Sequence, residues 1–114
     1  MRRSFVLKHR FPAGEAAISQ VAEYAYFYLD FLDNYPWPKA EAAFASNFYY
    51  AFMYAYNILK ARFPAGEAMI ATNAEYSYKY AREIIKGRWP PGESAIAKQP
   101  TYLKDYEAFL MRLK

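Results

Sequence analysis

The segment RFPAGEA at residues 10–16 recurs without change at residues 62–68, and a close copy, RWPPGES, stands at residues 88–94. The copies begin 52 and then 26 residues apart, which predicts a further copy at residue 36. The segment PWPKAEA begins there and keeps two residues of the other copies, the proline at its third position and the glutamate at its sixth. The chain therefore divides into four 26-residue repeats, at 10–35, 36–61, 62–87 and 88–113.

Six positions keep their character in every repeat. They are Pro12, Pro38, Pro64 and Pro90; Glu15, Glu41, Glu67 and Glu93; Ile18, Phe44, Ile70 and Ile96; Tyr24, Tyr50, Tyr76 and Tyr102; Tyr28, Tyr54, Tyr80 and Tyr106; and Leu32, Ile58, Ile84 and Leu110. Proline suits the first turn of a helix, where the dipole also favours glutamate. The last three positions are spaced i, i+4 and i+8, which places them on one helix face. Each repeat is therefore predicted to hold two helices.

The boundaries of these helices carry their own signals. Asn47 and Asn73 precede the second helix and favour the N-cap position, while Pro100 suits the first turn of that helix in the last repeat. The segment KGRWP at residues 86–90 is typical of a helix stop, with glycine past the end and proline soon after.

A small residue follows the first tyrosine in three repeats. Ala25, Ala51 and Ser77 occupy this position, and Leu103 replaces them in the last repeat. Small side chains allow a neighbouring helix to approach closely.

A pair of helices this short cannot bury its apolar face alone, so successive pairs are expected to stack. We predict an all-α fold: a short α-solenoid of four 26-residue helix pairs in a single domain, residues 1–114. Residues 1–9 would form an N-terminal cap. Lys104 and Glu107 replace apolar or aromatic residues of the other repeats, which suits a closing cap whose outer side meets water.

The third and fourth repeats, from ARFPAGEAMIATNAEYSYKYAREIIKG to RWPPGESAIAKQPTYLKDYEAFL, resemble a repeat of bacteriophage and large DNA virus proteins. Its running pattern is close to R-[FW]-P-x-x-E, then Y-x-x-x-Y and K-G. The resemblance covers residues 10–113, although repeat two has Pro36 in place of the opening arginine. It implies a helical repeat of viral origin and no enzymatic activity.

Composition narrows the class of protein further. The chain has 114 residues, a net charge of +4, no cysteine, and 21% aromatic residues, including 13 tyrosines. Charges and prolines interrupt every apolar run before it reaches the roughly 20 residues of a membrane span. We therefore expect no membrane interaction and an intracellular protein, in the host cytoplasm if phage-encoded.

Residues for catalysis or metal binding are scarce. His9 is the single histidine, between Lys8 and Arg10, where we expect a solvated side chain. Without cysteine, Cys–His chemistry and thiolate metal sites are excluded, and no glycine-rich loop is present to hold a phosphate. The sequence predicts a protein that is not an enzyme and needs no cofactor.

Three recurring features could bind a partner. The Arg10–Glu15, Arg62–Glu67 and Arg88–Glu93 pairs are expected to be structural joints, although arginine can also bind phosphate or carboxylate. The two tyrosine positions are expected in the core rather than in a ladder that stacks bases. Aromatic residues away from these positions favour a partner-binding surface; the candidates are Tyr26, Tyr35, Trp37, Tyr49, Phe52 and Tyr56.

The second half of the chain carries the positive charge, with ten basic and six acidic residues in 58–114. The candidates for binding nucleic acid are Lys79, Arg82, Lys86, Arg88, Lys98 and Lys104. Three functions follow as hypotheses. The leading one is a phage-encoded interaction protein that inhibits a host macromolecule, for example as an anti-CRISPR. The alternatives are nucleic-acid or nucleotide binding by the basic half, and a virion-structural or self-assembling protein, including a homodimer.

Overall fold

A computed structural model describes residue 14, residues 18–31 and residues 36–113, and these residues form helices and no strand. The elements in chain order are α3 (Ala22–Phe31), η1 (Pro38–Ala40), α4 (Glu41–Ala45), α5 (Phe48–Met53), η2 (Tyr54–Leu59), α6 (Pro64–Ile70), α7 (Ala74–Tyr80), η3 (Ala81–Ile85), α8 (Pro90–Ala97) and α9 (Pro100–Arg112). The all-α prediction is confirmed for this part of the chain. The predicted cap at 1–9, His9 and Tyr35 lie outside it.

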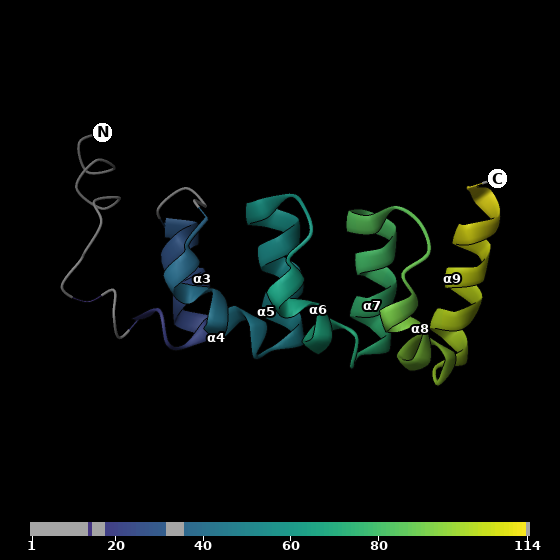
Figure 1. Cartoon of the computed structure of the whole chain (residues 1–114), viewed down its shortest axis with the longest axis horizontal. Coiled ribbons are helices and arrows are strands. Elements are labelled where there is room, and N and C mark those ends of the chain that lie inside the picture. The colour runs from purple at the N-terminus through teal and green to yellow at the C-terminus, as the bar shows by residue number, and fades with distance from the viewer. Residues whose placement is uncertain (1–13, 15–17, 32–35, 114) are drawn as a thin grey trace.

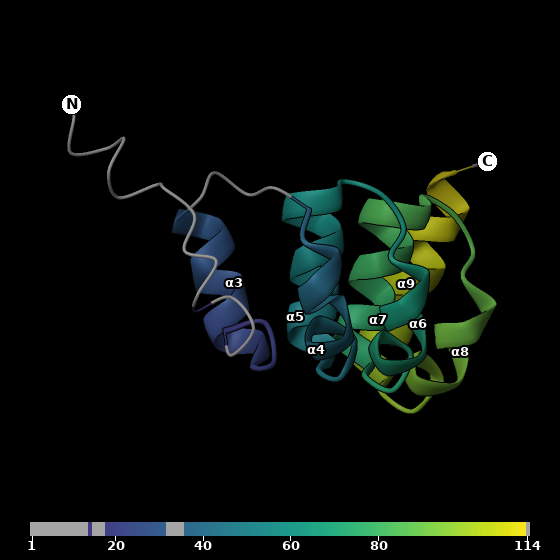
Figure 2. The ribbon, with the colours of Figure 1, turned by 60° about the vertical axis from the view of Figure 1, so that its left-hand side comes forward.

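The longer helices stand side by side in chain order along the long axis of the molecule (Figure 1). They are α3, α5 with η2, α7 with η3, and α9. The short helices α4, α6 and α8 each lie between two successive long helices in the chain. Figure 2 shows them on one side of the row. The principal extents are 49 × 27 × 20 Å, so the molecule is elongated along the direction in which the helices succeed one another.

The helices begin where the sequence predicts. The Asn47 side chain accepts hydrogen bonds from the backbone N–H groups of Tyr49 and Tyr50, and Asn73 does the same for Tyr76. Each satisfies donors that an open helix end leaves without partners. Pro100 lies in the first turn of α9, as predicted.

The long helices end in widened turns. After the π-helical segments η2 and η3, the chain reverses through a residue with left-handed backbone, Lys60 (φ 53°) or Lys86 (φ 61°). The Lys86 N–H group donates to the carbonyl of Ala81 at 2.7 Å. Gly87 follows the helix end, as expected, but the left-handed position itself belongs to lysine.

Close packing between successive elements depends on small residues, as the sequence predicts. A Cβ atom added to Gly66 of α6 would lie 2.9 Å from the Cβ of Ala51 in α5. One added to Gly92 of α8 would lie 2.7 Å from the Cβ of Ser77 in α7. Ala51 and Ser77 are themselves fully buried. Each short helix is thus seated against the preceding long helix at a contact that leaves no room for larger side chains.

The two tyrosine positions differ in burial. Tyr54, Tyr80 and Tyr106 lie in the core, as expected. The first position does not: Tyr24 is 60% exposed, and its equivalents Tyr50, Tyr76 and Tyr102 are only partly buried. The reason is that the buried face of α5 and η2 runs through residues 51, 54, 55 and 58. A residue one place before the first of these lies at the edge of the face.

Candidate functional site

A hydrogen-bonded cluster joins the two helices of one repeat. The hydroxyl of Tyr80 accepts a hydrogen bond from the backbone N–H of Phe63 at 2.9 Å and donates one to Glu67 at 2.6 Å. Arg62 donates to both oxygens of the same carboxylate, at 2.8 and 2.9 Å. The tyrosine comes from the long helix and the other three residues from the start of the short helix. The cluster therefore fixes the angle between them.

The same arrangement recurs in the described part of three repeats. Tyr106 bonds the Trp89 N–H and Glu93, with Arg88 paired to Glu93, and Tyr54 bonds the Trp37 N–H and Glu41. Pro36 replaces the arginine in repeat two, yet the tyrosine–glutamate bond remains at 2.7 Å. The arginine therefore supports a joint that the tyrosine and the backbone already make. Outside this cluster, the indole N–H of Trp89 is buried without a hydrogen-bond partner in the described residues.

The pKa values of Glu67 and Tyr80 are shifted in the directions that preserve the hydrogen bonds of this cluster. The Arg62 guanidinium holds the pKa of Glu67 below its ordinary value, and the Tyr80 hydroxyl adds to this effect. Burial and the hydrogen bond to Glu67 raise the pKa of Tyr80 well above its ordinary value. The carboxylate is thus kept charged and the phenol neutral. Since the guanidinium donors that face Glu67 are already bonded, the cluster is a structural joint rather than an anion site.

The predicted partner-binding residues separate into two groups. Tyr49 and Tyr56 are exposed, at 40% and 44%. Trp37 and Phe52 are buried, each at 5%, so they belong to the core and cannot meet a partner directly. Tyr26 is partly buried, and its hydroxyl accepts a hydrogen bond from the Asn57 side chain at 2.8 Å. Tyr35 lies outside the described residues.

The exposed rings rest on a network of other rings. Tyr56 stacks on Phe52, with centroids 5.4 Å apart and planes 15° apart. Tyr49 makes edge contacts with Tyr50 at 4.9 Å and with Tyr76 at 5.8 Å. We name the set of exposed and partly buried rings the aromatic surface; its members are Tyr26, Phe48, Tyr49, Tyr50, Tyr56 and Tyr76, and the buried Phe52 supports them from below. It extends from α3 across α5 and η2 to α7.

Tyr50 and Tyr76 are the members that the sequence analysis assigned to the core. A signal for their partial exposure was present in the small residues Ala51 and Ser77 that follow them. Those residues mark the centre of the contact with the next short helix, so the tyrosine before each of them must lie to one side.

The predicted nucleic-acid residues are only partly available. Lys79 pairs with Glu75 at 2.8 Å, Arg82 pairs with Glu83 at 2.8 Å, and Arg88 is held by Glu93. The exposed remainder consists of Lys86, Lys98 and Lys104. Half of the predicted positive charge is therefore compensated within the chain itself.

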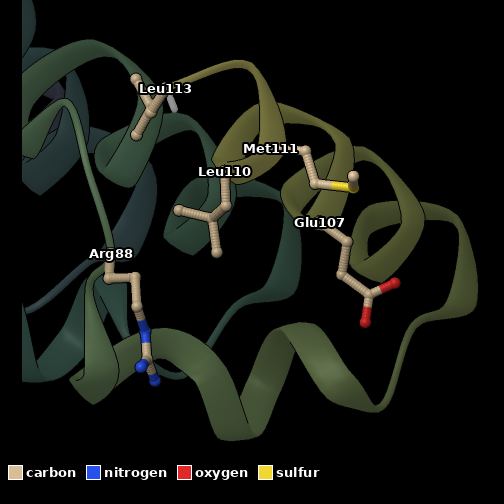
Figure 3. Close-up of a pocket in the computed structure, with 5 residues that line it drawn as sticks. All are labelled: Arg88, Glu107, Leu110, Met111 and Leu113. Carbon is tan, nitrogen blue, oxygen red and sulfur yellow. The ribbon is translucent and has the colours of Figure 1, made fainter.

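A hollow of about 550 Å³ opens at the C-terminal end, lined by Arg88, Glu107, Leu110, Met111 and Leu113. Leu110 projects between Arg88 and Glu107 (Figure 3). Met111 is 72% exposed. Glu107 and Lys104 are exposed, as predicted for a closing cap. Glu107 stands where Ala55 and Ala81 are fully buried in the repeats before it.

Comparison with protein-family models, with curated proteins and with solved structures finds no match to this chain. Within the part of the chain that the structure describes, His, Asp and Glu side chains form no group of three that could hold a metal ion. No helix there has both the length and the apolar character needed to cross a lipid bilayer.

Proposed function

We propose that this protein is a short α-solenoid that works as a non-enzymatic interaction protein and binds a partner protein through its aromatic surface. The observation that carries the proposal is the pair of exposed rings, Tyr49 and Tyr56, each supported by other rings. Aromatic side chains dominate the binding energy of protein interfaces. Rings already held by their neighbours lose little conformational freedom on binding, which favours affinity.

The proposed solenoid rests on the recurrence of one joint. The tyrosine, glutamate and backbone N–H of the joint meet with the same geometry in repeats two, three and four, at 26-residue intervals. The contact of Gly66 with Ala51 links repeat two to repeat three, and that of Gly92 with Ser77 links repeat three to repeat four. We extend this arrangement to the first repeat because its sequence carries the same pattern.

We further propose that the partner is a host protein. The resemblance to phage and viral repeats favours a protein encoded by a virus and acting in the host cytoplasm. The most concrete version is inhibition of a bacterial immunity effector of the CRISPR type. Nucleic-acid binding is less favoured, because Lys79, Arg82 and Arg88 are paired with carboxylates of their own chain.

An affinity capture from bacterial lysate, with and without nuclease, tests the proposal. The wild type is compared with the Tyr49→Ala/Tyr56→Ala double variant, and Met111→Ala is the control for an exposed apolar side chain far along the row. We expect a protein that the wild type and the control retain after nuclease treatment. The double variant should bind it about 30-fold or more weakly, as the loss of about 2 kcal/mol at a hot spot implies.

Two outcomes would contradict the proposal. Equal retention by the double variant would show that the aromatic surface is not the binding site. A capture that disappears with nuclease would show that the basic half binds nucleic acid instead. In every case, circular dichroism of the variants must match that of the wild type, so that loss of binding is not loss of fold.

A further inference from the structure

Two tyrosine rings of repeat three each have a cationic side chain over them, and both cations come from the same long helix as the rings. The amine of Lys79 lies 5.1 Å from the ring centre of Tyr76. The guanidinium of Arg82 lies 4.9 Å from the ring centre of Tyr78. The face of an aromatic ring attracts a cation through its quadrupole. In repeat three, the long helix thus places a positive charge over each of two rings.

Repeat two has the rings without the cations. Tyr50 and Phe52 stand 26 residues before Tyr76 and Tyr78, while Met53 and Tyr56 replace Lys79 and Arg82. Phe52 is covered by Tyr56, which stacks on it. Tyr50 is only partly buried, and the position from which Lys79 contacts Tyr76 holds the uncharged Met53 in its repeat. The end of the aromatic surface that faces α3 therefore lacks the positive charge that completes the equivalent position in repeat three.

Carboxylates border this same end. Glu23 and Asp30 are both exposed on α3, which stands beside α5 (Figure 1). Burial raises the pKa of Tyr50, and the nearby Glu23 carboxylate adds to the rise. Burial raises the pKa of Tyr26 as well, with a smaller contribution from Asp30. Glu23 and Asp30 lie about one turn before and after Tyr26 on α3, and the ring centre of Tyr26 lies 5.7 Å from that of Tyr50. Both carboxylates therefore lie on the helix face that borders the rings.

The charge of the chain is divided in the same sense. Residues 1–10 contain four basic residues and no carboxylate. Residues 11–57 contain one lysine and five carboxylates, a net charge of −4, and residues 58–114 contain ten basic and six acidic residues, a net charge of +4. The aromatic surface lies mainly in the acidic part. At its other end, Tyr56 borders a hollow lined by two lysines and one carboxylate, Lys60, Lys86 and Glu83, so that positive charge is in excess there. A cation is therefore favoured at the end near α3 and disfavoured at the end near η2.

We propose that the aromatic surface binds an arginine-bearing segment of a partner protein, with a guanidinium seated against Tyr49 and Tyr50 and paired with Glu23 or Asp30. This inference rests on the proposed function and specifies the chemistry of the partner. Arginine fits better than lysine because its planar group stacks on rings and bonds carboxylates through two donors at once. A phosphate backbone is disfavoured at the same place, because both carboxylates would repel it.

Direct titration with labelled peptides tests the inference on the full chain. The probes are an Arg-Gly-Gly repeat peptide, the same peptide with lysine for arginine, and the same peptide with glutamate. We expect the arginine peptide to bind most tightly, the lysine peptide more weakly and the glutamate peptide not at all. Binding of the arginine peptide should weaken as salt is raised, since the contact includes exposed charges.

Matched variants locate the contact. Tyr49→Leu keeps an apolar side chain but removes the ring, and it should weaken binding of the arginine peptide about ten-fold. Glu23→Gln together with Asp30→Asn should weaken it several-fold and reduce its salt dependence. Met111→Leu lies on α9, outside the aromatic surface, and should leave peptide affinity unchanged. Tyr102→Leu, at the equivalent of Tyr50 in the last repeat, serves as a second control.

Several results would overturn this inference. They are no binding of the arginine peptide, equal binding of all three peptides, tighter binding of an oligonucleotide, or a Tyr49→Leu variant that binds like the wild type. The proposed function fails separately. If the captured partner is lost with Tyr49→Ala/Tyr56→Ala but is insensitive to Glu23→Gln/Asp30→Asn and to salt, the interaction surface stands and only its cationic specificity is wrong.

Discussion

Replacing Tyr80 with phenylalanine removes one oxygen atom and so tests how much the hydrogen-bonded joint of repeat three stabilises the fold. The ring of Tyr80 is fully buried and packs against Trp89 at a centroid distance of 4.7 Å. Phenylalanine preserves that packing and leaves no cavity of consequence. The variant removes only the hydroxyl, which accepts from the Phe63 N–H and donates to Glu67.

The expected cost follows from these two bonds. A hydrogen bond to a charged group contributes about 1.5–3 kcal/mol, and a buried donor left without a partner costs about 1–3 kcal/mol. Glu67 retains Arg62, and the two losses overlap because they share one oxygen. We therefore expect Tyr80→Phe to lower the free energy of unfolding by about 2–4 kcal/mol, a large part of the 5–15 kcal/mol typical of a domain.

Urea unfolding followed by far-ultraviolet circular dichroism measures this difference. Tyr102→Phe is the matched control: its ring is partly buried and, in the described part of the chain, its hydroxyl makes no hydrogen bond. The control should lie within about 0.5 kcal/mol of the wild type, as substitutions away from such features do. If Tyr80→Phe is as stable as that control, the joint does not stabilise the fold, and the account of the repeat given above is wrong.

Two further predictions concern the packing and the charges of repeat three. Gly66→Ala should lower the free energy of unfolding by about 1–2 kcal/mol. The added Cβ would lie 2.6 Å from the Phe63 ring and 2.9 Å from Ala51, so overpacking should cost about 2–3 kcal/mol, of which the gain in helix propensity offsets about 1 kcal/mol. Gly87→Ala, whose added Cβ would meet nothing within 4 Å, is the control, and a Gly66→Ala variant as stable as wild type would contradict the contact. The melting temperature should fall at both extremes of pH. The pKa of Glu67 is lowered in the folded protein, so its charged form stabilises the fold above the ordinary pKa of 4.5, and this stabilisation is lost as pH falls. The pKa of Tyr80 is raised, so its neutral form stabilises the fold below the ordinary pKa of 10.0, and this stabilisation is lost as pH rises. Glu67→Gln should flatten the acid side of that curve, and an unchanged acid side would exclude this carboxylate as the cause.

The sequence predicted the joint better than it predicted the surface, and the reason is physical. Proline, glutamate and asparagine act on the backbone beside them, so their roles at helix starts can be derived locally. The bond from Tyr80 to Glu67 spans 13 residues, and repetition identified both positions but not their contact. Burial depends on how one helix is rotated against the next. The spacing of the tyrosines could not fix that rotation, and Tyr50 and Tyr76 were consequently assigned to the core.

Trp37 shows the opposite error. Its place away from the recurring tyrosine positions made it a candidate for the partner-binding surface, whereas the indole is buried and packs on Tyr28 at 5.2 Å. Repetition could have corrected the prediction, because Trp37 is equivalent to Phe63 and Trp89, which lie in the core of their own repeats.

The pattern of variation among the repeats separates fold from function. The tyrosine and the glutamate of the joint are the same in each repeat because each repeat must solve the same packing problem. The position of Tyr49 holds Glu23, Glu75 and Thr101 in the other repeats, an acid or a hydroxyl in place of a ring. These residues lie on the outer side, where packing does not dictate their identity. A binding site needs to be built only once along such a row, so it should occur where a repeat departs from its copies. Repeat two departs most, through exposed rings beside the carboxylates of α3, and that is where the partner is expected to bind.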